Sequence, residues 1–97
     1  MKVRFLVPAR EEFLQAVEFY EGQSSGLGAE FLIEVEEKVE SLKGAPNQGA
    51  PYIDEVRRTL LRRFPYNIVY LIEPDALVIL AIAHQRRKPG YWKNRVR

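Results

Sequence analysis

A chain of 97 residues suits one compact domain, because a second hydrophobic core needs about 50 more residues, so we expect a single domain over residues 1–97. Hydrophobic residues make up 46% and charged residues 29%, which excludes disordered and collagen-like chains. The net charge of +2 is unevenly placed, since residues 1–50 hold five Lys/Arg and nine Glu, whereas residues 51–97 hold ten Lys/Arg and four acids. The second half is therefore the electropositive one.

The N-terminal stretch predicts a strand followed by a helix. Residues 2–7 alternate and are rich in β-formers, and Pro8 cannot donate to a β ladder but suits the first turn of a helix. From residue 9 to about residue 23 apolar residues recur at helical spacing, with Glu11 and Glu12 in the first turn, where the helix dipole favours acids. We expect an amphipathic helix there.

A second amphipathic helix is predicted after a break rich in Gly and Ser. Its apolar positions recur every three or four residues: Leu27, Phe31, Val35, Val39 and Leu42. The opposite face is rich in Glu, and we interpret it as a solvated helix surface without chemistry. A loop rich in Gly and Pro over residues 44–51 ends the helical half.

The remaining chain is β in character, with candidate strands at residues 56–64, 66–72 and 76–83. Pro74 favours a tight turn between the last two, which predicts an antiparallel hairpin. In the last strand we expect two alternating apolar faces: Leu77, Ile79 and Ala81 on one, and Val78, Leu80 and Ile82 on the other. Such a strand is either central and buried on both sides within the protein or covered by a partner.

The predicted order is therefore β-α-α-β-β-β, with helices and strands segregated along the chain. This order favours an α+β architecture in which an N-terminal helical hairpin packs on an antiparallel sheet that the first strand joins. The short apolar start resembles no signal peptide, and no apolar run approaches the roughly 18–20 residues that span a bilayer. We expect a cytoplasmic protein with no membrane contact.

Several kinds of chemistry lack support in the sequence. The chain has no Cys, only one His, no Gly-rich phosphate loop and no G-x-S-x-G motif, so we expect no metal and no cofactor. Basic and aromatic residues are instead concentrated in two clusters. These are Arg57, Arg58, Arg62 and Arg63 in or beside one predicted strand, and His84, Arg86, Arg87, Lys88, Tyr91, Trp92, Lys93, Arg95 and Arg97 after the last strand.

If the two clusters converge on one concave face, guanidinium groups there can bind phosphate and the aromatic rings can stack on unpaired bases. That interpretation predicts a surface facing nucleic acid or the ribosome. The alternative is that the Arg residues solubilise an exposed strand and that Tyr91 and Trp92 cover the core. His84 is either a general acid or base or the hydrogen-bond partner of a neighbour.

Four stretches of the chain carry a resemblance to a known family: AREEFLQAVEFYE, GLGAEFLIEVEEKVESL, RRFPYNIVYLI and LVILAIAHQRRKPGYWKNR. They resemble the RelE/ParE toxin superfamily of type II toxin–antitoxin systems, formerly labelled plasmid stabilisation proteins, and in particular its ParE-like branch. The resemblance implies a β-α-α-β-β-β fold. It also implies a cognate protein antitoxin that docks by β-addition and by helix-in-groove binding, within a higher-order toxin–antitoxin complex.

The resemblance implies one of two growth-inhibiting activities. RelE-like members are metal-independent endoribonucleases that cut mRNA on the ribosome, whereas ParE-like members block DNA gyrase and need no hydrolytic site. Asn67 occupies a position where nucleolytic relatives tend to carry Arg, and a neutral amide cannot neutralise a developing dianion. We therefore favour a toxin that acts on gyrase, with the ribosome-dependent endoribonuclease and a non-toxic, antitoxin-binding co-repressor as alternatives.

Each activity assigns its own residues. If the chain is a nuclease, the catalytic candidates are His84, Arg63, Arg86 and Tyr91. The candidates for binding the target or nucleic acid are Arg57, Arg58, Arg62, Arg87, Trp92 and Arg95.

Overall fold

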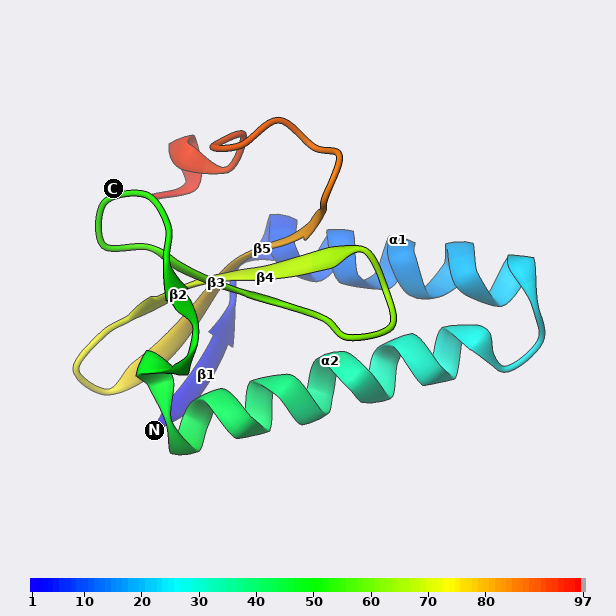
Figure 1. Ribbon diagram of the computed structural model, residues 1–97, viewed down its shortest axis with the longest axis horizontal. Coiled ribbons are helices and arrows are strands. Elements are labelled where there is room, and N and C mark those ends of the chain that lie inside the picture. The colour runs from blue at the N-terminus through cyan, green and yellow to red at the C-terminus, as the bar shows by residue number, and fades with distance from the viewer. Residues whose placement is uncertain (97) are drawn as a thin grey trace.

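The computed structural model describes residues 1–96, so Arg97 of the predicted basic tail lies outside the described residues. The elements in chain order are β1 (Lys2–Phe5), α1 (Val7–Gln23), α2 (Leu27–Gly44), the 3-10 turn η1 (Pro46–Gln48), β2 (Ala50–Pro51), β3 (Arg57–Leu60), β4 (Tyr66–Ile72), β5 (Ala76–His84) and the 3-10 turn η2 (Lys93–Arg95) (Figure 1). The predicted α+β class, with a helical hairpin near the N-terminus and strands after it, is confirmed.

The strands form one sheet in the order β1-β5-β4-β3-β2. Strands β2 to β5 pair antiparallel, but β1 runs parallel to β5, with Lys2 opposite Ala76 and Phe5 opposite Ile79. The sheet is therefore mixed rather than wholly antiparallel. The helical hairpin separates β1 from the other strands in sequence, and β5 lies between β1 and β4, which makes it the central strand that its two apolar faces predict.

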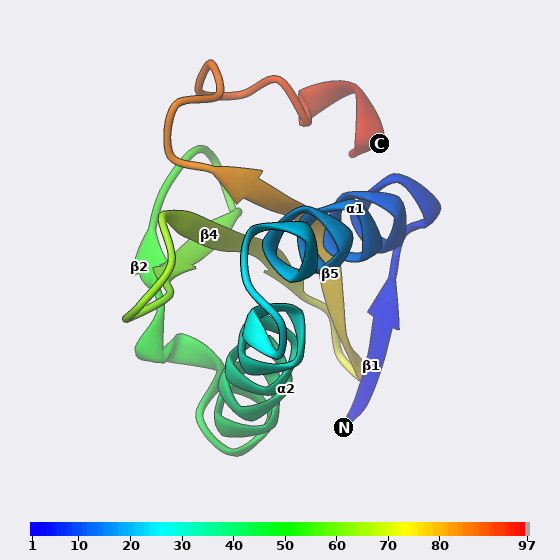
Figure 2. The ribbon, with the colours of Figure 1, turned by 90° about the vertical axis from the view of Figure 1, so that its right-hand side faces the viewer.

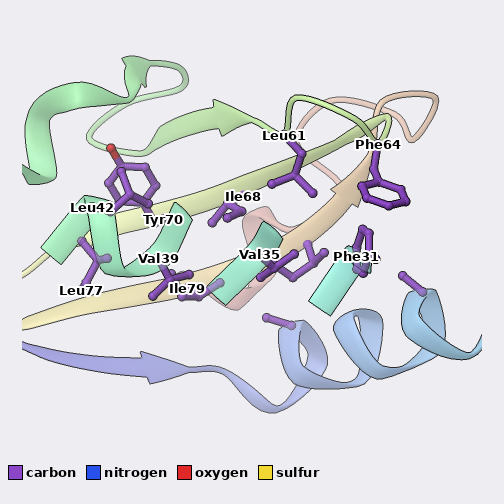
Figure 3. Close-up of a cluster of buried hydrophobic side chains, with 13 residues drawn as sticks. Phe31, Val35, Val39, Leu42, Leu61, Phe64, Ile68, Tyr70, Leu77 and Ile79 are labelled. Atoms are coloured by element: carbon purple, nitrogen blue, oxygen red, sulfur yellow. The ribbon is translucent and has the colours of Figure 1, made fainter. Parts of the chain in front are cut away.

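One face of the sheet is covered by both helices. Figure 3 shows side chains of α2, among them Phe31, Val35 and Leu42, that point toward β4 and β5. We call this cluster the helical-side core; it comprises Ala9, Ala16, Phe31, Val35, Val39, Leu42, Leu61, Phe64, Ile68, Tyr70, Leu77, Ile79 and Ile82. The apolar repeat predicted for the second helix thus faces the sheet, as an amphipathic helix requires.

The turn between the helices is fixed by Glu21. Its carboxylate accepts the backbone N–H of Gly26, which has a positive φ of 88°, and that of Gly28 at 3.0 Å. A Cβ at Gly28 would lie 2.6 Å from the carbonyl oxygen of Val17, so only glycine lets the two helices approach this closely.

A bulge changes the predicted alternation of β5. Val69 pairs with Ala81 and Tyr70 with Ile79, so Leu80 is an extra residue between the two pairs. After the bulge the faces are exchanged, and Ala81 joins Val78 and Leu80 on one side of the sheet while Ile82 joins Leu77 and Ile79 on the other. The assignment of Ala81 and Ile82 to faces by strict alternation was therefore wrong, because one extra residue shifts the period of two.

The other face of the sheet is covered by the segment after β5, residues 85–96, which we call the C-terminal segment. In Figure 2 this segment, orange to red, and α2 lie on opposite sides of the sheet. The buried residues on this side form the tail-side core: Val56, Val69, Ala76, Val78, Leu80, Ala81, Ala83 and Trp92. The C-terminal segment has no regular structure apart from η2.

Candidate functional site

Trp92 belongs to the tail-side core. Its side chain is 2% exposed and its ring lies 5.9 Å from that of Tyr52, centroid to centroid. A ring at this depth is not available to stack on an unpaired base. Its burial supports the alternative, that a large aromatic residue covers the core of a small domain.

Glu12 on α1 anchors the C-terminal segment. Its carboxylate accepts hydrogen bonds from both terminal nitrogens of Arg95, at 3.0 and 2.9 Å, and from the Tyr91 hydroxyl at 2.8 Å. The side chains of Glu12 and Arg95 are each 16% exposed. Arg95 is thus held in a bidentate, largely buried ion pair within the protein, which leaves little of its guanidinium exposed.

The same pair also satisfies backbone groups of β5. Strand β1 ends at Phe5 opposite Ile79, and β5 continues past that point. There the N–H of Ile82 donates to Glu12 at 3.1 Å, and the carbonyl of Leu80 accepts from Arg95 at 2.9 Å. Because an unpaired buried backbone group is costly, these side chains take the place of a continued strand.

Tyr91 is not poised to act as a base. Burial, and after it the hydrogen bond and the negative charge of Glu12, raise the pKa of the Tyr91 hydroxyl well above its usual range. The hydroxyl therefore keeps its proton and donates a hydrogen bond to Glu12. The ring of Tyr91 is covered by the guanidinium of Arg87, which lies 3.8 Å from the ring centroid.

A small pocket of about 70 Å³ lies between the C-terminal segment and the ends of the neighbouring strands. We call it the basic pocket; its polar lining includes Arg58, Asn67, His84, Arg87 and Lys88. The structure thus brings together Arg58 of the first basic cluster with His84 and Arg87 of the second. None of the described residues that line the pocket is acidic.

His84 has a defined orientation at the edge of the basic pocket. Its Nδ1 accepts the backbone N–H of Arg86 at 3.0 Å, so the neutral ring carries its proton on Nε2. Its ring lies edge-on to that of Tyr66, with centroids 5.1 Å apart. His84 therefore has the hydrogen-bonded neighbour that one sequence interpretation expects, and the side chain of Arg86 is exposed beside it.

Arg57 lies on the other face of the sheet. It pairs with Tyr70, a member of the helical-side core, and its guanidinium donates to the carbonyls of Gly49 at 2.5 Å and Asn47 at 3.2 Å. Arg58 pairs with Val69 of the tail-side core. Since successive residues of a strand point to opposite faces, Arg57 and Arg58 lie on opposite faces of the sheet, and the first cluster does not meet the second as a whole.

Arg62 and Arg63 lie in the turn between β3 and β4, because β3 is shorter than the predicted strand over residues 56–64. Their backbone N–H groups donate to the Glu34 carboxylate, and the Arg63 guanidinium pairs with Glu30, which raises the Arg63 pKa. Both acids belong to α2, so these two Arg residues face the helical side. The interpretation of that Glu-rich face as merely solvated missed these contacts.

Two residues of the site were not found by sequence reasoning. Glu12 carried a signal, because it follows Ala9 by three residues and precedes Ala16 by four, and both alanines are buried. An acid on the apolar stripe of a helix needs a buried partner. No sequence signal marked Asn67 as a pocket residue. In the structure Asn67 is 8% exposed, and its Oδ1 has no hydrogen-bond partner among the described residues.

Two further observations concern a metal site and a membrane-spanning helix. Within residues 1–96 no three Asp, Glu or His side chains gather in a way that could hold a metal ion. In the same range no helix is both long and apolar enough to cross a membrane.

Comparisons with known proteins agree with this architecture. Residues 3–89 match the family model described as ParE toxin of type II toxin-antitoxin system, parDE. A solved chain of the chromosomal ParDE TA system from P. aeruginosa superposes with a TM-score of 0.73 at 21% identity, covering 87% of this chain and 95% of that chain. At that identity the likeness shows the fold. A search of the curated proteins found no match.

Proposed function

The chain belongs to the ParE toxin family of type II toxin–antitoxin systems, and from this premise we propose that it inhibits growth through DNA gyrase until a cognate antitoxin neutralises it. Gyrase acts in the cytoplasm, which is where we place this activity. The family match over residues 3–89 carries the assignment as a toxin. The choice of gyrase over the ribosome rests on the geometry of the nuclease candidates.

One of those candidates, Arg63, lies apart from the others, because His84 and Tyr91 both line the basic pocket and Arg86 donates its backbone N–H to His84. Arg63 lies against α2 and is paired with Glu30, whereas His84 lies at the basic pocket. The Tyr91 hydroxyl is engaged by Glu12 and holds its proton. Metal-free cleavage of RNA needs a base for the 2′-hydroxyl and cations around the reacting phosphate. The separation of Arg63 from the basic pocket and the engagement of the Tyr91 hydroxyl by Glu12 support a toxin that binds its target without hydrolysing it.

Strand β1 supports the proposal of a protein antitoxin. It forms one edge of the sheet, and beside it a groove of about 630 Å³ runs toward α2. Apolar side chains in this groove come from both elements and from α1: Val3, Phe5, Phe13, Val35 and Val39. An extended antitoxin segment can add to the strand edge while its apolar residues enter the groove.

An assay of DNA supercoiling with purified toxin and gyrase tests the proposed target. We expect inhibition that rises with toxin concentration and disappears when the cognate antitoxin is added first. The matched comparison is an mRNA cleavage assay on translating ribosomes with the same toxin preparation. Unimpaired supercoiling at toxin excess would contradict the gyrase proposal, and mRNA cleavage in the parallel assay would replace it with the ribosomal one.

The β1 edge can be tested without disturbing the pairing of β1 with β5. The backbone N–H groups of Lys2 and Leu6 donate to the carbonyls of Asp75 and Ile79, so by alternation the N–H of Val3 points to the open edge. Val3→Pro removes that donor, and Val3→Ala keeps it while shortening the same side chain. We expect Val3→Pro to weaken antitoxin binding at least about tenfold more than Val3→Ala. Equal affinities would place the antitoxin elsewhere.

A further inference from the structure

The described residues that line the basic pocket carry an excess of positive charge. Arg58, Arg87 and Lys88 contribute three cations to its lining, and none of the described lining residues is acidic. By contrast, Arg4, Arg63 and Arg95 each form an ion pair with a Glu. A concave site lined by one sign of charge attracts ligands of the opposite sign, so the ligand we seek is an anion.

The two pocket arginines are positioned by aromatic rings. The Arg58 guanidinium lies 4.1 Å from the centroid of Tyr52, and the Arg87 guanidinium lies 3.8 Å from that of Tyr91. Stacking on a ring fixes the plane of a guanidinium but uses none of its N–H groups. Both side chains are therefore held in place with their donors available for a bidentate contact.

The lining of the pocket also contains a buried polar atom without a hydrogen-bond partner among the described residues. Asn67 is 8% exposed, lines the pocket, and has an Oδ1 atom with no partner among residues 1–96. A buried amide without a partner is costly, and a terminal amide can turn to present either its oxygen or its NH₂ group. Because Oδ1 is an acceptor, Asn67 binds an anion only in the turned orientation, in which the NH₂ group faces the pocket and donates to the anion.

The volume of the pocket and the coverage of its aromatic rings further restrict which ligands can bind. A volume of about 70 Å³ has room for a few waters or one tetrahedral oxyanion, but not for a nucleobase. Trp92 is buried, and Arg58 and Arg87 cover faces of Tyr52 and Tyr91. The site therefore lacks the free aromatic platform that recognition of an unpaired base requires.

We propose that the basic pocket binds a single phosphate group, held by Arg58 and Arg87 in the lining that they share with Asn67, without recognition of a base. Such a phosphate belongs either to the backbone of a nucleic acid or to a free phosphate compound. The proposal goes beyond the action on gyrase and does not depend on it, because it concerns binding by the purified toxin alone.

The chain has one tryptophan, and it lines the pocket, so the fluorescence of Trp92 reports on binding directly. We would titrate purified toxin with inorganic phosphate at constant ionic strength. We expect a saturable change in emission for the wild type. Arg87→Gln and Arg58→Gln should each weaken phosphate binding about tenfold or more, and Arg87→Lys should weaken it less, because it keeps the charge but loses the bidentate contact.

The control is Arg10→Gln, which changes the net charge equally at an exposed position of α1 outside the pocket lining. It should bind phosphate as the wild type does. Equal binding by Arg10→Gln, Arg58→Gln and Arg87→Gln would show general charge attraction and overturn the proposal, as would the absence of a saturable change with phosphate.

Parallel titrations with a mononucleotide and with DNA and RNA oligonucleotides of equal length identify the source of the phosphate. Tighter binding of both oligonucleotides, independent of base sequence, indicates a nucleic-acid backbone. Binding of phosphate and mononucleotide alone indicates a free phosphate compound. A strong preference for one base sequence would contradict the absence of base recognition. Failure to inhibit gyrase would refute the proposed function only, since it leaves the fluorescence result unchanged.

Discussion

The two faces of the sheet are covered in different ways. On the helical side, α2 contributes Phe31, Val35, Val39 and Leu42 from successive turns, so the contact is repeated along a regular element. On the tail side, a segment with little regular structure covers the sheet, and its anchor is the carboxylate of Glu12. Repeated apolar contacts spread the stabilisation over many residues, whereas a polar anchor concentrates it at one.

This difference predicts two levels of stability within one small protein. The helical-side core should open only with global unfolding, whereas the C-terminal segment should detach from the sheet by local unfolding at a lower free energy. Four substitutions test the comparison, in decreasing order of expected effect.

The largest effect is expected from Phe31→Ala in the helical-side core. Phe31 is 0% exposed and its ring lies 5.1 Å from those of both Phe64 and Tyr66. The cavity should cost about 3–5 kcal/mol in the free energy of unfolding, measured by urea denaturation. Ile33→Ala on the exposed face of the same helix is the control and should cost about 0.5 kcal/mol or less. Similar costs for both would refute the assignment of the faces.

Glu12→Ala tests the anchor on the tail side. It leaves the largely buried Arg95 and the Ile82 N–H without their partner, and we expect a loss of about 2–3 kcal/mol. Hydrogen exchange should accelerate first in the C-terminal segment, while amides of α2 keep their protection. Glu11→Ala, at the exposed neighbouring position, should change neither quantity. Uniform acceleration over both faces would contradict the two levels of stability.

Gly49→Ala tests the rim of the helical-side core. The N–H of Gly49 donates to the Tyr70 hydroxyl at 3.1 Å, and an added Cβ would collide with that hydroxyl. We expect a loss of about 1–3 kcal/mol by thermal or urea unfolding. Gly44→Ala meets nothing within 4 Å and should stay within about 0.5 kcal/mol of the wild type. Equal effects would show that the contact with Tyr70 yields easily.

The smallest effect is expected from Tyr91→Phe, which removes one hydrogen bond to Glu12 and should cost about 1 kcal/mol at neutral pH. The pKa of Tyr91 is raised above its ordinary 10.0 in the folded protein. The stabilisation by the Tyr91 hydroxyl is therefore fully present below the ordinary, unfolded-state pKa and is lost as pH rises through the folded-state pKa. The difference in unfolding free energy between the wild type and Tyr91→Phe should therefore shrink above about pH 10. A constant difference would show that Tyr91 titrates normally.

Local periodicity explains why much of the fold could be predicted. The strand expected at residues 66–72 has those bounds in the structure, and the apolar repeat of the second helix faces the sheet. Prediction was less successful where the chain departs from a period. Leu61 and Phe64 are apolar and extend the strand pattern, yet they enter the core from a turn. That turn is held by the Glu34 carboxylate, which lies 28 positions before Arg62 and 29 before Arg63 in the sequence. No local sequence pattern reveals a contact over such a separation.

The candidate site was predicted by composition but not by arrangement. The basic clusters do meet in the basic pocket at Arg58, His84 and Arg87. Arg57 points to the opposite face of β3 and binds the Gly49 carbonyl, and Arg95 is paired with Glu12. The separation of Arg57 from Arg58 follows from the period of a strand and was available from the sequence. The partnership of Glu12 with Arg95 joins residues 83 positions apart and needed the structure.

The central claim, that this ParE family toxin acts on gyrase, is tested most directly by induced expression of the chain alone in a bacterium. DNA and protein synthesis would be followed by pulse labelling through the first minutes after induction. The account predicts that DNA synthesis fails first and that co-expression of the cognate antitoxin prevents it. Failure of protein synthesis before DNA synthesis would contradict the account and indicate cleavage of mRNA on the ribosome.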